Sequence, residues 1–176
     1  MNFFDFSFWQ NFLSNLLATI IGVALGIPAA LWINRVVENR TTKERVEKII
    51  RLLKDELSRN EVSLSNLDGN LPRVVHEAGN ISAQLRVELW KVYSDGGELQ
   101  WVKDHVLVSM LAGTYFAIRA VMTLADRAYE FSQNGQPGHP LPQTVEDNLM
   151  EAIRSANYIV KATIRKIDDT LRYQHR

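Results

Sequence analysis

Residues 12–33 read FLSNLLATIIGVALGIPAALWI, and they lie inside a longer run, residues 6–34, that carries no ionisable side chain. As a helix that rises about 1.5 Å per residue, this stretch spans roughly 33 Å, which matches the hydrocarbon core of a bilayer. A soluble helix this apolar on every side would need a large domain around it, and only about 140 residues follow. The pattern therefore predicts a transmembrane helix at residues 12–33.

The charges are distributed unevenly about this predicted helix. All 20 Lys and Arg residues follow it, beginning at Arg35, whereas the only acidic residue before it is Asp5. Because Lys and Arg are retained on the cytoplasmic side, we expect the aromatic-rich tail, residues 1–11, outside and residues 34–176 in the cytoplasm. The tail lacks Lys and Arg, and the apolar run exceeds a signal-peptide core, which argues against a cleaved signal. We expect a single-pass protein.

Small residues recur every four positions along one face of the predicted span, at Ala18, Gly22, Gly26 and Ala30. This spacing lets two helix backbones approach closely in lipid and favours self-association, although glycine is also simply common in membrane helices. Pro28 cannot donate a backbone hydrogen bond and predicts a bend. Because the span holds no charged residue and no histidine, it offers no side chains for a proton relay.

The cytoplasmic part opens with a heptad pattern. Its members are spaced alternately by four and three residues, and one is polar: Val46, Ile50, Leu53, Leu57, Asn60, Leu64 and Leu67. A buried Asn in such a seam fixes the register of a bundle or coiled coil. Thr41 and Glu44 form a capping-box sequence that could restart the helix before the seam, and Asp68-Gly69-Asn70 is a turn that ends it.

Two further long helices are predicted. Asp104 is placed to cap the first, which ends near Ser132, and Thr144 with Asp147 starts the second after a loop with three prolines, residues 133–143. The apolar positions of the first helix keep helical spacing: Leu107, Leu111, Tyr115, Ile118, Met122, Ala125 and Tyr129. Those of the second do the same: Val145, Leu149, Ile153, Ala156, Val160, Ile164, Ile167 and Leu171. With no period-two run, the sequence predicts an all-α helical-bundle domain.

Residues 71–95 connect the heptad helix to these two. We interpret them as two short helices, with Pro72 at a first helical position, Asn80 or Ser82 as a cap, and a stop at Asp95-Gly96-Gly97. The aromatic residues Trp90, Trp101 and Tyr115 are expected in the core and not on a base-stacking platform.

The composition excludes several chemistries. The chain has no cysteine, which removes disulfide and thiolate chemistry, and a nearly balanced charge that gives no overall attraction to nucleic acid. The four histidines, His76, His105, His139 and His175, are scattered without a second ligand at metal spacing. Helical nucleases that place four to six residues between an Arg and a His differ from Arg172 and His175, which are separated by two. We therefore predict no enzyme activity, no catalytic residues, no metal and no cofactor.

Two clusters of basic residues offer candidate binding surfaces. Arg154, Lys161, Arg165 and Arg172 fall on one face of the last helix and could bind an anionic ligand, a nucleotide or RNA, or could simply face solvent. The second cluster follows the span and suits anionic lipid headgroups: Arg35, Arg40, Lys43, Arg45, Lys48 and Arg51. A third set, Arg119, Thr123 and Asp126, is interpreted as a polar contact between helices or protomers.

The order of features resembles a loose class of small, single-span bacterial inner-membrane proteins. The resemblance is carried by the span ending GIPAALWINR, then LKDELSRNEVSL, ELWKVYSDGGELQWV and LAGTYFAIRAV. Proteins of this class are mostly uncharacterised, and some are found beside antiviral defence and CRISPR-associated genes. The resemblance implies an oligomeric effector in the bacterial inner membrane that disturbs the membrane when its cytosolic domain senses a signal or partner.

Two functions follow as hypotheses. The first is a homo-oligomeric membrane effector or pore, whose cytosolic helical domain senses a signal, as in antiviral defence. The alternative is a membrane-tethered adaptor or scaffold that recruits a cytosolic partner or binds an anionic nucleotide or RNA ligand.

Overall fold

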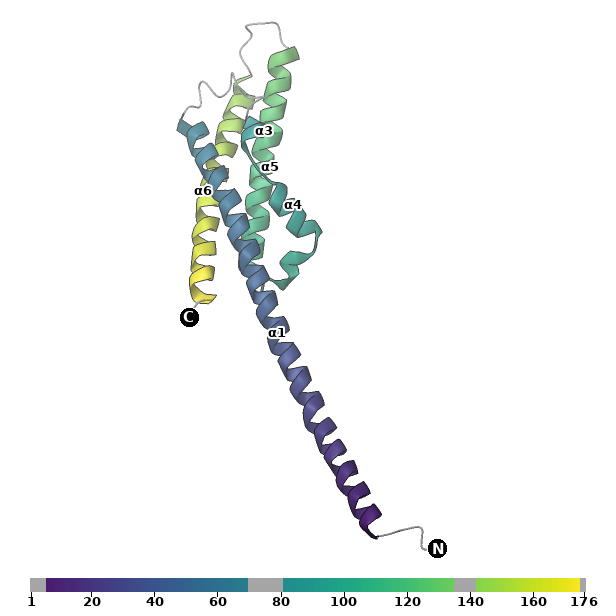
Figure 1. The fold of residues 1–176 in the computed structure, drawn as a ribbon. Helices are drawn as coiled ribbons and strands as arrows, with labels where there is room; N and C mark the ends of the chain where they lie inside the picture. The colour runs from purple at the N-terminus through teal and green to yellow at the C-terminus, as the bar shows by residue number, and fades with distance from the viewer. Residues whose placement is uncertain (1–5, 70–80, 135–141, 175–176) are drawn as a thin grey trace. The chain divides into compact units, whose positions relative to one another are not determined.

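The computed structural model describes residues 6–69, 81–134 and 142–174, and every regular element in these ranges is helical (Figure 1). The elements are α1 (Phe6–Gly69), α3 (Ile81–Gln84), α4 (Glu88–Asp95), the 3-10 turn η2 (Glu98–Trp101), α5 (His105–Asn134) and α6 (Gln143–Gln174). The predicted all-α class is confirmed. The chain divides into two compact units, residues 1–44 and 45–176, which are described separately.

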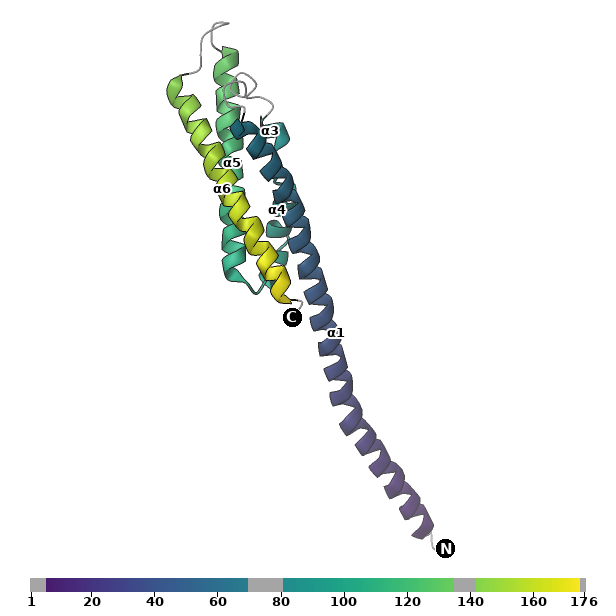
Figure 2. The same cartoon turned by 90° about the vertical axis from the view of Figure 1, so that its left-hand side faces the viewer.

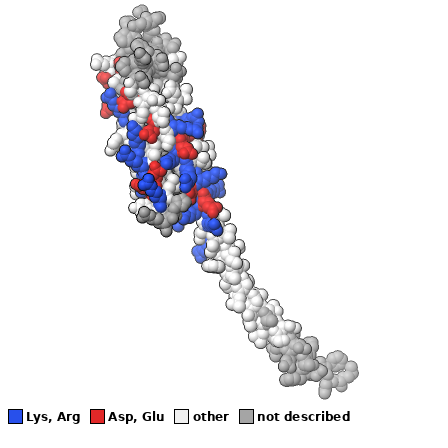
Figure 3. All heavy atoms as spheres, turned by 60° about the vertical axis from the view of Figure 1, so that its left-hand side comes forward, with Lys and Arg blue, Asp and Glu red and all other residues white. Residues whose placement is uncertain are grey.

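The first unit is the N-terminal part of α1. No residue of its most apolar window is buried, so that Leu25 and Trp32 are exposed, and Figure 3 shows this stretch without charged side chains. The helix continues through Pro28. It also continues past Thr41, whose hydroxyl donates to the carbonyl oxygens of Val37 and Glu38 at 3.1 and 3.0 Å. The predicted capping box at Thr41 is therefore wrong, because this hydroxyl bonds back to the preceding turn.

Within the described ranges, two helices are long and apolar enough to cross a membrane. One is α1, and the other is the part of α5 at His105–Phe131, a third of whose apolar window is buried. The prediction of an N-terminal apolar helix of membrane length is confirmed, whereas length and composition alone do not make it the single span.

The second unit is a bundle of residues 45–69 of α1 with α5 and α6, which lie side by side in both ribbon views (Figures 1 and 2). All seven positions of the predicted heptad seam are buried. Three polar contacts then join α1 to α6: Lys54 to Asp168 at 2.6 Å, Ser65 to Asn157 at 3.3 Å, and Asp68 to Arg154 at 3.1 Å. From one contact to the next, the α1 partner moves forward by as many residues as the α6 partner moves back. The two helices therefore run antiparallel in one register.

The helices α5 and α6 form an antiparallel pair. The buried hydroxyls of Thr114 and Thr163 lie 2.7 Å apart, and Thr114 also donates to the carbonyl oxygen of Met110, so Thr163 donates to Thr114. At the other end, Asp104 accepts a 2.9 Å hydrogen bond from the backbone N–H of Leu107, which confirms the predicted cap. Its second oxygen accepts from Lys166 of α6 at 3.0 Å.

The described part of the connecting segment contains two short helices, α3 and α4; the first predicted helix, from Pro72, lies outside the described residues, and the second is interrupted at residues 85–87. Ser82 is not a cap: it lies inside α3, and its hydroxyl donates to the Asp126 carboxylate of α5. Pro72 and Asn80 lie outside the described residues. The stop after Asp95 is confirmed, and Gly97 takes a left-handed conformation, φ 69°, that leads into η2, a turn the sequence pattern did not predict.

Smaller boundary differences occur at the two long helices. Helix α5 extends to Asn134, and α6 begins at Gln143, one residue before the predicted start; the loop between them falls outside the described residues, at 135–141. The core prediction holds for Tyr115, which is 1% exposed, and Trp90 stacks on its ring with centroids 5.0 Å apart. It is wrong for Trp101, which is 57% exposed, because η2 turns it away from the bundle.

Candidate functional site

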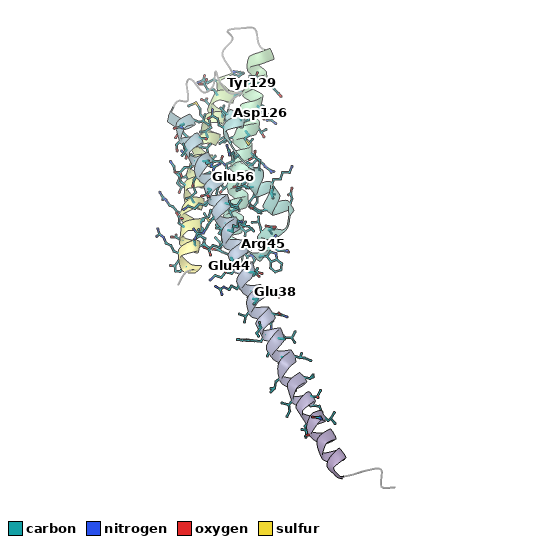
Figure 4. All side chains as sticks on the ribbon, viewed as in Figure 1. Glu38, Glu44, Arg45, Glu56, Asp126 and Tyr129 are labelled. Carbon is teal, nitrogen blue, oxygen red and sulfur yellow. The ribbon has the colours of Figure 1, made fainter. Side chains whose placement is uncertain are left out.

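A buried carboxylate lies at the centre of the bundle. Glu56 of α1 is 5% exposed, and its two oxygens accept hydrogen bonds from the Tyr115 hydroxyl at 2.8 Å and from the backbone N–H of Leu89 at 3.2 Å (Figure 4). Leu89 lies in the first turn of α4, where free N–H groups favour negative charge. This single side chain therefore ties three helices together.

The phenol of Tyr115 stays protonated in this environment. Burial of the ring, and then the neighbouring Glu56 carboxylate, raise the pKa of Tyr115 well above its ordinary value. A tyrosine held in this way donates a hydrogen bond and does not serve as a base at neutral pH. The Glu56–Tyr115 pair is a structural contact.

Asn60 lies one turn further along α1 and hydrogen-bonds the non-helical backbone that precedes α4. Its amide nitrogen donates to the carbonyl oxygen of Arg86 at 2.7 Å, and its amide oxygen accepts from the N–H of Arg86 at 2.8 Å. The residue was predicted to fix register in a seam of helices. It is buried in that seam, but the backbone that it fixes belongs to the segment between α3 and α4.

The four predicted ligand-binding residues lie on one helix, but they do not converge on a pocket. Arg154 pairs with Asp68 of α1, while Lys161, Arg165 and Arg172 make no ion pair with another described residue. Arg172 borders a hollow of about 360 Å³ between α1 and α6 that is also lined by Asp55 and Asp168. Because acidic groups share this surface, it lacks the uniform positive charge of an anion site. Figure 3 shows both signs of charge intermingled over the bundle.

The basic cluster after the predicted span is likewise partly paired. Arg40 contacts Glu44 at 3.3 Å, Arg51 contacts Glu47 at 2.7 Å, and Arg45 pairs with Glu98 of η2. Such exposed pairs are individually weak, so these side chains keep much of their capacity to meet anionic headgroups.

The remaining predicted sites lie mainly on α5. Asp126 makes the expected interhelix contact through Ser82, whereas Arg119 and Thr123 are exposed beside it. His105 is exposed at the first position of α5, and the other three histidines lie outside the described residues. Within the described ranges no group of three His, Cys, Asp or Glu side chains could hold a metal ion.

The small-residue face of the predicted span is open. A Cβ atom added at Gly22 or Gly26 would meet no other side chain and no distant backbone within 4 Å, and Ala30 is exposed. The side chain of Ala18 lies outside the part of the chain that the structure describes. Within the described residues of the first unit, this helix face is therefore open.

An apolar groove between α5 and α6 was not predicted from the sequence. It encloses about 520 Å³ and is floored mainly by small side chains of the two helices: Gly113, Ala117, Ala120, Ala152, Ser155 and Ile159. Phe116 stands beside it with 77% of its surface exposed. One sequence feature could have indicated an exposed ring here. In the run LAGTYFA, Phe116 lies on the opposite helix face from Ile118 and Ala125, which are buried.

Comparisons with protein-family models, with curated proteins and with solved structures found no match to this chain. The fold and the surfaces described above therefore carry the functional argument on their own. The resemblance to single-span inner-membrane proteins stays a prediction.

Proposed function

We propose that this chain is a membrane effector that works as a homo-oligomer, with residues 12–33 crossing a bacterial inner membrane and residues 34–176 in the cytoplasm. One observation supports this most: no residue of the apolar window of α1 is buried. An uninterrupted apolar helix with its side chains exposed requires either lipid or other apolar helices around it.

Helix α5, by contrast, is assigned to the bundle and not to a second span. Its inner face carries Thr114 and Tyr115, which are hydrogen-bonded to α6 and α1, and these bonds would be lost if α5 entered lipid alone. Its outer face carries Arg119 and Arg127, which are costly in a bilayer.

Self-association is supported by the open face of Gly22 and Gly26. In lipid, helices associate through close backbone contact at such small residues. The polar side chains of the span are few, and Thr19 donates to the carbonyl oxygen of Asn15 in its own helix at 2.8 Å. A pore lined by these spans would be mostly apolar and would open by wetting of its constriction. The bundle then has the role of the sensing domain.

The test compares wild type with Gly26→Leu and with Ala24→Leu, which places the same side chain on the opposite helix face. Detergent-solubilised wild type should be oligomeric and should release dye from liposomes, and Gly26→Leu should lose both properties while Ala24→Leu keeps them. A monomeric wild type that leaves vesicles sealed would remove the proposal.

A membrane-tethered adaptor is the second candidate, and it is supported by the compact second unit, residues 45–176, with a core of its own. Deleting residues 1–33 separates the two. An adaptor lacking its anchor still captures its cytosolic partner, whereas an effector lacking its span loses membrane activity.

A further inference from the structure

The groove between α5 and α6 and the exposed Phe116 beside it form a matched pair on one surface. The groove floor is built from alanine, glycine and serine, so two helices approach closely there and leave a shallow apolar hollow. Phe116, on the edge of that hollow, is the most exposed large apolar side chain of the bundle. A projecting aromatic ring next to a complementary hollow is the arrangement that a two-fold interface uses, since each copy supplies both parts.

One cation and one anion beside the groove have no partner within the described chain. Arg127 follows the groove residue Leu124 by three positions on α5, and Glu151 lines the groove from α6. Neither side chain makes a hydrogen bond or ion pair with another described residue. The exposed residues further out carry both signs: Arg119, Asp126 and Glu130 on α5, and Asp147 and Arg154 on α6.

Arg127 and Glu151 also lie at the same position along the axis of the α5–α6 pair. The contact of Thr114 with Thr163 fixes the antiparallel register of α5 and α6. Thirteen residues forward from Thr114 is Arg127, and thirteen residues back from Thr163 is Met150, the neighbour of Glu151. Because both helices rise by about 1.5 Å per residue, Arg127 and Glu151 lie at nearly the same position along the axis of the helix pair.

We propose that this groove binds a second copy of the same chain. A two-fold axis parallel to the helices places α5 of one copy against α6 of the other. Each residue keeps its position along the helix axis under this rotation. Phe116 then enters the groove of the partner, and Arg127 faces Glu151 of the partner subunit, twice over. Charge complementarity selects this occupant, because lipid would leave Arg127 and Glu151 unpaired at the groove. This inference rests on the proposed self-association and assigns it a surface in the bundle.

The test uses the full-length chain in detergent, with its mass measured over a dilution series. Arg127→Glu and Glu151→Arg should each weaken association about tenfold by placing like charges together, and the double variant should restore it. Arg165→Glu, an exposed charge on α6 away from the groove, is the matched control and should change nothing. Phe116→Ser should weaken association without a loss of helix content.

Cysteine cross-linking gives a second readout, because the chain has no cysteine of its own. A mixture of Phe116→Cys and Ile159→Cys chains should form a disulfide-linked dimer under mild oxidation, and a mixture of Phe116→Cys with Asp169→Cys should not. Unchanged association in both single charge reversals, or no rescue in the double variant, would overturn the proposal. So would a Phe116→Ser variant that loses only vesicle binding, which would assign the groove to lipid.

The outcomes also separate this inference from the proposed function. If the groove variants stay oligomeric while Gly26→Leu becomes monomeric, association through the span stands and the groove proposal fails. If wild type is itself a monomer at every concentration, both proposals fail.

Discussion

Tyr115 of α5 donates a 2.8 Å hydrogen bond to the carboxylate of Glu56 on α1, and both side chains are buried. The remaining Glu56 oxygen is taken by the N–H of Leu89, and the ring of Tyr115 is covered by Trp90. The helices α1, α5 and the short α4 thus meet at one buried polar contact.

Tyr115→Phe should destabilise the bundle by about 1–3 kcal/mol, because it leaves one buried carboxylate oxygen without a donor. The measurement is the midpoint of chemical denaturation, followed by far-UV circular dichroism. Tyr158→Phe removes a hydroxyl from a side chain that is 76% exposed and serves as the control, with a change below about 0.5 kcal/mol. Equal effects of the two substitutions would show that the Glu56 contact contributes nothing.

Asn60→Ala should also cost about 1–3 kcal/mol, since it orphans the N–H and the carbonyl oxygen of Arg86 together. The loss should be local: hydrogen exchange should accelerate first at residues 85–95, before the long helices are affected. Asn148→Ala, at an exposed position of α6, is the control. If Asn60→Ala speeds exchange uniformly over the bundle, the assigned role of Asn60 is wrong.

Asp104 should make stability depend on acid pH. The backbone hydrogen bond from Leu107, and then the contact with Lys166, hold the pKa of Asp104 below its ordinary value of 3.8. A carboxylate whose pKa is lower in the folded state contributes stability above its unfolded value and loses it as the pH falls through the folded value. Asp104→Asn should therefore cost about 1 kcal/mol at pH 7, and this difference should shrink below pH 3.8.

The measurement is a set of denaturation curves between pH 2 and pH 7, which are experimental settings chosen on either side of the carboxyl range. Asp169→Asn, at an exposed position of α6 without a described partner, is the control and should change stability by less than about 0.5 kcal/mol. A constant difference between wild type and Asp104→Asn across the whole range would contradict the assigned coupling.

Much of the fold follows from apolar spacing, and the reason is visible in particular residues. The alternation of four and three residues from Val46 to Leu67 forces one buried face, and Asp104 has the chemistry of a cap, so both predictions hold. The prediction at Thr41 is wrong because a threonine hydroxyl can either cap the N–H groups at a helix start or donate to a carbonyl oxygen of the preceding turn. Local sequence does not distinguish these two uses.

The surfaces were harder to predict because they depend on which elements meet. From the sequence alone, Glu56 would be expected to face solvent. Its burial is explained only by its contacts with Tyr115 and α4. The stripe from Arg154 to Arg172 lies on one face as predicted, but Asp68 of α1 pairs with Arg154, and Asp168 of α6 itself pairs with Lys54 of α1 beside the stripe. The groove beside Phe116 requires two helices at once, which no single-helix pattern contains.

The central claim is that residues 12–33 cross the membrane once and that α5 does not. The most direct test labels single cysteines with a membrane-impermeant maleimide in intact spheroplasts and again after permeabilisation, using Ser7→Cys, Ser109→Cys and Phe131→Cys in this cysteine-free chain. We predict labelling of Ser7→Cys in intact cells, and of Ser109→Cys and Phe131→Cys only after permeabilisation. Labelling of Ser109→Cys and Phe131→Cys from opposite sides, or of all three sites from the cytoplasmic side alone, would contradict it.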